Sequence, residues 1–264
     1  MRQGLLAVPL ALAGAVVQAG SSAEPPLRLE RKVELPEVRG RIDHLAVDVR
    51  GQRLFVAALG NDTVEVIDLA AGRRAHTIRG LAEPQGVLFE PGENRLFVAN
   101  GRDGSVRIFD ASSFAPTGRL RCGDDADNLR LDAARRQIWV GYGRGALAAI
   151  DASGRRLGEV VLPVHPESFQ LERDGPRIFV NLPDAGQVAV VDREKRAQVA
   201  SWGTGEASAN YPMALDEPHR RLFVVCRTPA RLLVLDTGSG RQVAALPTVG
   251  DADDVFYDAA AGRV

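Results

Sequence analysis

The sequence predicts an all-β fold, a β-propeller assembled from four-stranded antiparallel blades. Two series of short apolar segments support this prediction, because both recur along the chain with the same period. Glycine, asparagine and aspartate separate these segments at intervals that suit tight hairpins. Repeats that each hold four short strands are typical of propeller blades.

The first series starts at residues 53–57 with the sequence Arg-Leu-Phe-Val-Ala and recurs in steps of 42, 42, 40 and 44 residues. The second series starts at residues 64–68 with Val-Glu-Val-Ile-Asp and keeps the same period. Each of its copies ends in aspartate, at Asp68, Asp110, Asp151, Asp192 and Asp236. Two independent series with one period indicate a structural repeat that runs along the chain.

Each repeat holds four apolar segments of strand length. In the first repeat the predicted strands are His44 to Val49, Leu54 to Ala58, Thr63 to Leu69 and Arg73 to Ile78. The second strand is apolar without alternation, as expected where neighbouring blades cover both faces of a sheet, and the fourth is more charged, as expected at the outer edge.

The repeat pattern predicts five complete blades and a partial sixth in this chain, since residues 262–264 occupy the place that residues 52–54 hold in the first repeat. Residues 30–35 have the spacing of an outermost strand that precedes the first blade and could complete the last one. We therefore expect the propeller to be incomplete at its C-terminus, with roughly 60 to 70 further residues in the natural gene product.

The repeat resembles that of the YVTN β-propeller family, which is related by fold to quinoprotein and lactonase propellers. The resemblance rests on the Arg-Leu-Phe-Val-Ala segment, a turn of glycine, asparagine and aspartate, and the Thr-Val-Glu-Val-Ile-Asp segment, and it covers residues 28–264. It implies a seven-bladed propeller when complete. It implies little about function, because many members of the family have no determined biochemical role.

The N-terminus has the pattern of a signal peptide. Arg2 precedes an apolar run from Leu5 to Val17, and small residues follow in segments 17–19 and 21–23. This run is shorter than the roughly 20 residues that span a bilayer. We therefore expect a signal peptide at residues 1–23, a propeller domain at residues 24–264, no membrane insertion, and a periplasmic or secreted location.

The charge balance argues against nucleic acid as a partner. The chain has 33 basic and 34 acidic residues and a formal net charge of -1, so no overall field attracts a polyanion. The two cysteines, Cys122 and Cys226, belong to different predicted blades. They are expected to be small buried side chains, with a disulfide as the less favoured alternative.

Candidate ligand-binding residues come from the positions that enter each innermost strand, because these positions surround the mouth of the central channel. Alignment of the repeats gives one level at positions 43, 85, 127, 167, 211 and 253, and a second level one residue later. The polar residues chosen as candidates at or beside these levels are Asp43, His44, Gln85, Asp127, Asn128, Glu167, Asn210, Asp253 and Asp254. Carboxylates that converge on one opening could hold a divalent cation or a polar small molecule.

A structural explanation of the same residues stays open. Aspartate, asparagine, serine and proline before a strand are ordinary turn formers whose side chains bond to the local backbone. The same holds for turn-forming neighbours such as His165-Pro166. The repeated aspartates at the end of the third strand, such as Asp68, are expected to be structural caps.

The leading functional hypothesis is an exported, non-catalytic module that binds a small molecule or a protein at a propeller face, because no catalytic motif is present. The alternative is a metal-dependent hydrolase similar to lactonase propellers, with Glu167, Asp127, Asn128, Asp253 and His44 as candidates. A quinone-binding propeller is disfavoured, because the chain has no pair of adjacent cysteines. Catalytic residues and metal ligands stay unassigned at this stage.

Overall fold

The computed structural model describes residues 27–264 of the chain. The predicted signal peptide at residues 1–23 lies outside the described residues. Val33–Val264 form one compact unit, and the described residues 27–32 belong to another. None of the described residues 27–264 lies in a helix long and apolar enough to cross a bilayer.

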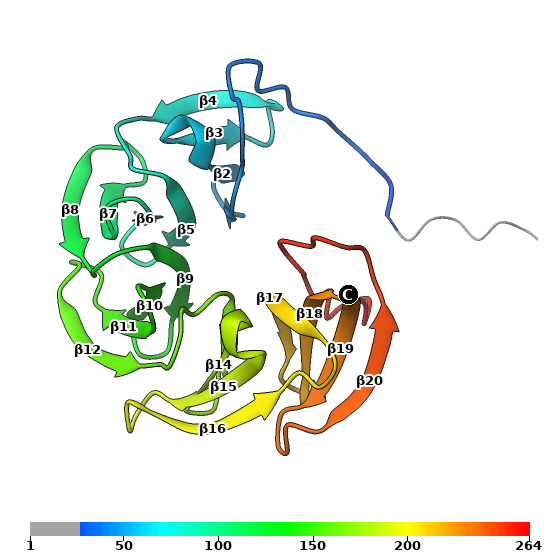
Figure 1. The fold of residues 1–264 in the computed structure, drawn as a ribbon. Coiled ribbons are helices and arrows are strands. Elements are labelled where there is room, and N and C mark those ends of the chain that lie inside the picture. Colours follow the sequence, from blue (N-terminus) through cyan, green and yellow to red (C-terminus); the bar gives the residue numbers. More distant parts are fainter. Residues whose placement is uncertain (1–26) are drawn as a thin grey trace, which may run out of the picture. The chain divides into compact units, whose positions relative to one another are not determined.

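The compact unit is a β-propeller whose five sheets follow one another around a common centre (Figure 1). In each blade the strands follow the sequence order from the centre outwards. The first blade consists of β1 (Leu45–Asp48), β2 (Arg53–Ala58), β3 (Thr63–Asp68) and β4 (Arg73–Ile78), and the second of β5 (Pro84–Glu90), β6 (Arg95–Asn100), β7 (Ser105–Asp110) and β8 (Pro116–Arg121). The third blade consists of β9 (Ala126–Asp132), β10 (Gln137–Tyr142), β11 (Ala146–Ile150) and β12 (Arg156–Val161). The fourth and fifth blades are β13 (Phe169–Leu171), β14 (Arg177–Leu182), β15 (Gln187–Asp192) and β16 (Ala197–Gly203); and β17 (Ser208–Asp216), β18 (Arg221–Thr228), β19 (Ala230–Asp236) and β20 (Gln242–Pro247). All pairings within the blades are antiparallel, so the five complete blades predicted from the sequence are confirmed.

The hydrophobic core lies between neighbouring blades. One cluster joins Phe97 and Ile108 of the second blade to Ile138 and Val140 of the third, and all four side chains are buried. The second strand of each blade is therefore apolar on both faces, since each face packs against another sheet. The outermost strands, such as β4, are more exposed.

The predicted strand boundaries agree with the structure to within a residue or two. Among the described residues the helical segments are two short 3-10 turns, η1 (Leu59–Asn61) and η2 (Pro183–Ala185), each between the second and third strands of its blade. Cys226 is buried, Cys122 is half-buried, and both thiols are free. Burial raises the pKa of the Cys226 thiol to about 11.

The sixth repeat is present as a turn without a complete sheet. Asp258 and Arg263 form an isolated bridge, and Arg263 Nε lies 3.3 Å from Asp258 Oδ2. The same arrangement occurs in the first blade, where Arg53 Nε lies 3.0 Å from Asp48 Oδ2. Residues 30–35, expected to complete the last blade as its outermost strand, form no strand here. The five described sheets include no strands of that last blade with which they could pair, so this expectation stays a prediction.

Candidate binding site at the channel mouth

A cavity of about 260 Å³ lies where the chain enters the innermost strands. Seven of the nine residues chosen from the repeat alignment line it: Asp43, His44, Gln85, Asp127, Asn128, Glu167 and Asp253. These residues come from five different repeats. The alignment of repeats thus located one shared pocket.

Asp127 is the most buried carboxylate of this pocket. It is the second residue of β9, it is 5% exposed, and its Oδ1 atom has no hydrogen-bond partner. Gly86 of the second blade permits this close packing, because a Cβ atom at that position would lie 2.0 Å from the carbonyl oxygen of Asp127. A buried carboxylate oxygen without a partner is costly, unless something else binds it.

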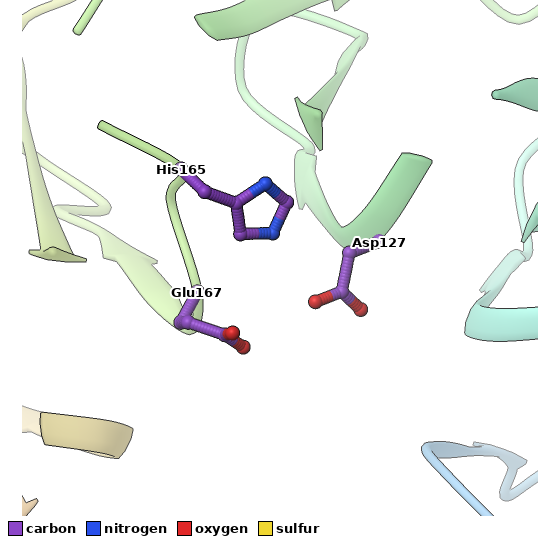
Figure 2. Close-up of side chains that lie close together, drawn as sticks. All are labelled: Asp127, His165 and Glu167. Atoms are coloured by element: carbon purple, nitrogen blue, oxygen red, sulfur yellow. The ribbon is translucent and has the colours of Figure 1, made fainter. Parts of the chain in front are cut away.

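His165 and Glu167 face Asp127 from the segment that leads into β13 (Figure 2). They are two residues apart, and in an extended chain such residues point to the same side. One ligand atom of each of the three side chains lies within 4.8 Å of the others. His165 Nδ1 donates a hydrogen bond to the carbonyl oxygen of Gly143, which leaves Nε2 as the acceptor atom of the ring.

The acid groups of this cluster have unusual proton affinities. Burial raises the pKa of Glu167 to about 7, and the charge of Asp127 acts in the same direction against the opposing effects of His165 and His44. Burial also raises the pKa of Asp127, and His44 only partly offsets it. The protein therefore does not fully compensate the negative charge of the two carboxylates, which favours a bound proton or a bound cation.

His44 lies at the boundary of the cluster. Its Nε2 atom is 3.7 Å from Oδ1 of both Asp43 and Asp127, and Asn128 Nδ2 lies 3.0 Å from the same nitrogen. Its Nδ1 atom is 3.6 Å from Asp254 Oδ2. Burial lowers the pKa of His44, but the hydrogen bond to Asp254 and the nearby carboxylates outweigh this effect, so the pKa is raised overall.

Other predicted residues form a rim whose charges are paired. Gln85 Nε2 donates to Asp125 Oδ1 at 2.9 Å, and Asp43 Oδ2 lies 3.3 Å from Arg41 Nη2. Asp253 forms an ion pair with Arg227. These contacts distinguish the rim from Asp127 and Glu167, which have no basic side chain as an ion-pair partner other than histidine in the described part of the chain.

The two remaining candidates lie outside this cavity. Asp254 lines a second cavity, deeper in the channel, that also contains His44 and Asn128. Asn210 is fully buried between the fourth and fifth blades, where its Nδ2 atom donates to Asn181 Oδ1 and to the carbonyl oxygen of Gln187, each at 2.9 Å. Its hydrogen bonds connect two blades.

The structural explanation holds for the repeated aspartates and not for the acidic cluster. Asp236 Oδ1 accepts hydrogen bonds from the backbone N–H groups of Gly238 and Ser239, and the equivalent aspartates bond to their turns in the same way. The prediction that these aspartates are structural caps is confirmed. Neither Asp127 nor Glu167 forms such a bond with its own loop within residues 27–264.

His165 was expected to be a turn-forming neighbour of the channel mouth, and its position in the cluster was not predicted from the sequence. The available signal was its spacing from Glu167, because a histidine two residues before a glutamate in an extended segment places two metal-binding side chains on one side. The alignment of levels did not use this signal, since His165 lies two residues ahead of the first level.

Comparison with known proteins supports the fold. No family model matches the chain, and no curated protein sequence matches it. A solved structure of Kuenenia stuttgartiensis hydrazine synthase is similar to this chain, with 18% sequence identity and a TM-score of 0.70 over 80% of this chain and 75% of that one. At this identity the likeness supports the propeller architecture alone.

Proposed function

We propose that this chain is an exported propeller module that binds a divalent cation at the channel mouth through Asp127, His165 and Glu167. The observation that carries the proposal is the convergence of one ligand atom from each side chain within 4.8 Å, where one of the three residues is a buried aspartate whose Oδ1 atom has no hydrogen-bond partner. A cation there would offset the repulsion that raises the pKa of both carboxylates.

The donor set favours Zn²⁺ or Mn²⁺ over Ca²⁺. Imidazole nitrogen suits transition metals, whereas Ca²⁺ takes six to eight oxygen ligands. The backbone bond at His165 Nδ1 resembles the outer-shell contacts that orient histidine ligands in metal sites. Three protein ligands would leave coordination positions for water or for a donor atom of a small molecule.

Titration of the metal-free protein with Zn²⁺, Mn²⁺ and Ca²⁺, followed by calorimetry and by thermal unfolding, tests this proposal. At 100 times its dissociation constant, a bound cation should stabilise the fold by about 2.7 kcal/mol. The double variant Asp127→Asn, Glu167→Gln should lose this effect and stay folded.

The matched control is Asp174→Asn, Glu194→Gln, which removes the same charge from two exposed positions outside the cluster. It should keep the cation effect. Equal cation binding by the wild type and the cluster variant would rule out this site.

A metal-dependent hydrolase is the second candidate function, and the position of His44 favours it. Its Nδ1 atom faces Asp254 while Nε2 faces the acidic cluster, an arrangement that would let it accept a proton from water at the site. Ester or lactone hydrolysis that requires added cation and falls by about 100-fold or more in His44→Gln would support this function. Cation binding without any such hydrolysis would support the binding module alone.

The proposal of export rests on the pattern of residues 1–23. Expression of the full chain in a bacterium, followed by cell fractionation and N-terminal sequencing, should give a processed protein outside the cytoplasm. An unprocessed cytoplasmic product would contradict export without bearing on the cation site.

A further inference from the structure

A second cavity, of about 190 Å³, lies deeper in the channel than the acidic pocket. Both cavities are lined by His44 and Asn128, whose side chains lie 3.0 Å apart and therefore separate them. The two side chains belong to the first and third blades. Gly86 of the second blade also lines the deeper cavity, and a Cβ atom there would lie 2.0 Å from the carbonyl oxygen of Asp127.

Arg130 gives the deeper cavity a positive charge. Its Nη1 atom donates to the carbonyl oxygen of Leu129 at 2.8 Å, and its Nη2 atom donates to Ser168 Oγ at 3.3 Å. It forms no ion pair with a carboxylate anywhere in the described range 27–264, and a guanidinium has five N–H donors, so donors are left for a ligand. Burial lowers the pKa of Arg130, and the charges of Asp254, which lines the same cavity, and of Asp127 only partly offset this effect.

The other walls of the cavity combine the Asp254 carboxylate, whose Oδ2 atom lies 3.6 Å from His44 Nδ1, with one amide and apolar side chains. Gln170 lines it and donates through Nε2 to the carbonyl oxygen of Met213 at 2.9 Å. Val87, Leu129 and Met213 supply buried apolar surface. The side of the cavity that these three residues form suits the hydrocarbon part of an organic acid, whereas an inorganic phosphate would face it with oxygens that lack partners.

We propose that the deeper cavity binds a small organic acid, with its carboxylate on Arg130 and its hydrocarbon part against Val87, Leu129 and Met213. A planar guanidinium matches the two oxygens of a carboxylate and can form parallel hydrogen bonds with both. The volume corresponds to roughly six water-sized groups, which suits an acid of the size of butyrate. This site is distinct from the cation site and does not require a metal.

Calorimetric titration of the metal-free protein with sodium butyrate tests the proposal, with butyramide, sodium phosphate and sodium chloride at equal ionic strength as comparison probes. Butyrate should bind saturably and raise the melting temperature, whereas butyramide lacks the charge and chloride lacks the shape. Arg130→Gln should weaken butyrate binding by about 10- to 100-fold, because it removes a charge-assisted hydrogen-bond pair. Arg130→Lys keeps the charge but loses the paired donors, so it should also weaken binding and provides a test if the glutamine variant does not fold.

Arg173→Gln, at an exposed turn position, is the matched control and should bind butyrate as the wild type does. Butyrate binding that persists in both Arg130 variants, or phosphate binding as strong as butyrate binding, would overturn the proposal. So would the absence of saturable binding. The experiment is independent of the cation site, since it uses metal-free protein and Arg130 lies outside the cation cluster.

Discussion

The two ends of strand β9 each hold a buried aspartate, but the two aspartates differ in their charged partners. Asp127 near its start is 5% exposed and Asp132 at its end is 4% exposed. Both carboxylates have a buried oxygen without a hydrogen-bond partner, but their ion pairs differ. Asp132 Oδ2 lies 3.0 Å from Arg193 Nη1 and 3.6 Å from Arg135 Nη1, whereas the basic side chain nearest to Asp127 Oδ1 among the ion pairs of the described residues is His44, at 3.7 Å. The difference indicates that the fold can supply a countercharge to a buried aspartate and does so at only one end of the strand.

The ion pair at Asp132 is one form of a contact between neighbouring blades, in which an arginine binds a carboxylate and also a backbone carbonyl oxygen. In the first blade Arg53 binds Asp48 and donates to the carbonyl oxygen of Ala111 in the second blade. In the fourth blade Arg177 binds Glu172 and donates to the carbonyl oxygen of Thr237 in the fifth. The same pair of contacts thus occurs in the first and fourth blades, and in each it links a blade to the next one.

The third blade lacks the arginine of this contact, because Gln137 occupies its position. Arg193 of the fourth blade, whose side chain is 1% exposed, supplies the guanidinium from the other side. It also donates to the carbonyl oxygens of Glu172 and Gly175. A countercharge is thus maintained at Asp132 even where the repeat sequence changes, which makes the lack of a basic partner at Asp127 informative.

The largest expected effect comes from a direct comparison of the two aspartates. Asp132→Asn should destabilise the fold by about 3–5 kcal/mol, because it leaves the buried Arg193 charge uncompensated. Asp127→Asn in the metal-free protein should leave stability unchanged or increase it, since it removes a charge whose burial is unfavourable. Urea unfolding of both variants measures the difference, and a similar loss in both would remove the distinction between the two ends.

The next effect is a pH dependence of the folding stability, which comes from the acidic cluster around Asp127 at the start of β9. The folded protein keeps Glu167 protonated up to about pH 7, whereas an ordinary glutamate loses its proton near 4.5. The stability that Glu167 contributes is therefore complete below pH 4.5 and is lost as the pH rises to about 7, by at most about 3 kcal/mol. The raised pKa values of Asp127 and His44 act in the same direction.

Chemical unfolding of the metal-free protein between pH 4.5 and 7.5 checks this dependence. Glu167→Gln should flatten the curve, whereas Glu194→Gln, at an exposed position, should not. Saturating cation should also flatten it, because cation binding strengthens as the carboxylates lose their protons. A curve of the wild type that rises with pH would contradict the raised pKa of Glu167.

The fold could be predicted well from the sequence because the same strand pattern occurs five times. Where one copy departs from the pattern, the other copies still show it. Position 127 was found in the same way, by its place in the aligned repeats. His165 and Arg130 were missed because each occurs in one blade only, so no alignment of repeats could mark them. Their importance depends on which side chains lie across the channel, and that depends on the positions of separate blades.

The smallest predicted effect concerns the substitution at Gln137. Gln137 pairs with Asp132 across the sheet in the register that Arg53 has with Asp48. If a guanidinium at either position can pair with Asp132, then Gln137→Arg should partly rescue Arg193→Gln, because the introduced guanidinium would bind Asp132 as Arg53 binds Asp48.

The rescue should recover about 0.5–1.5 kcal/mol of the stability lost in the single variant, the scale of the net contribution of one typical intramolecular hydrogen bond. In the wild-type background the same Gln137→Arg change should bring no gain, since Arg193 already occupies the partner position. Urea unfolding of the two single variants and the double variant forms a double-mutant cycle that measures this coupling. Additive effects in the cycle would show that the two positions do not share Asp132, and the interpretation of Arg193 as a replacement for the missing arginine would then be wrong.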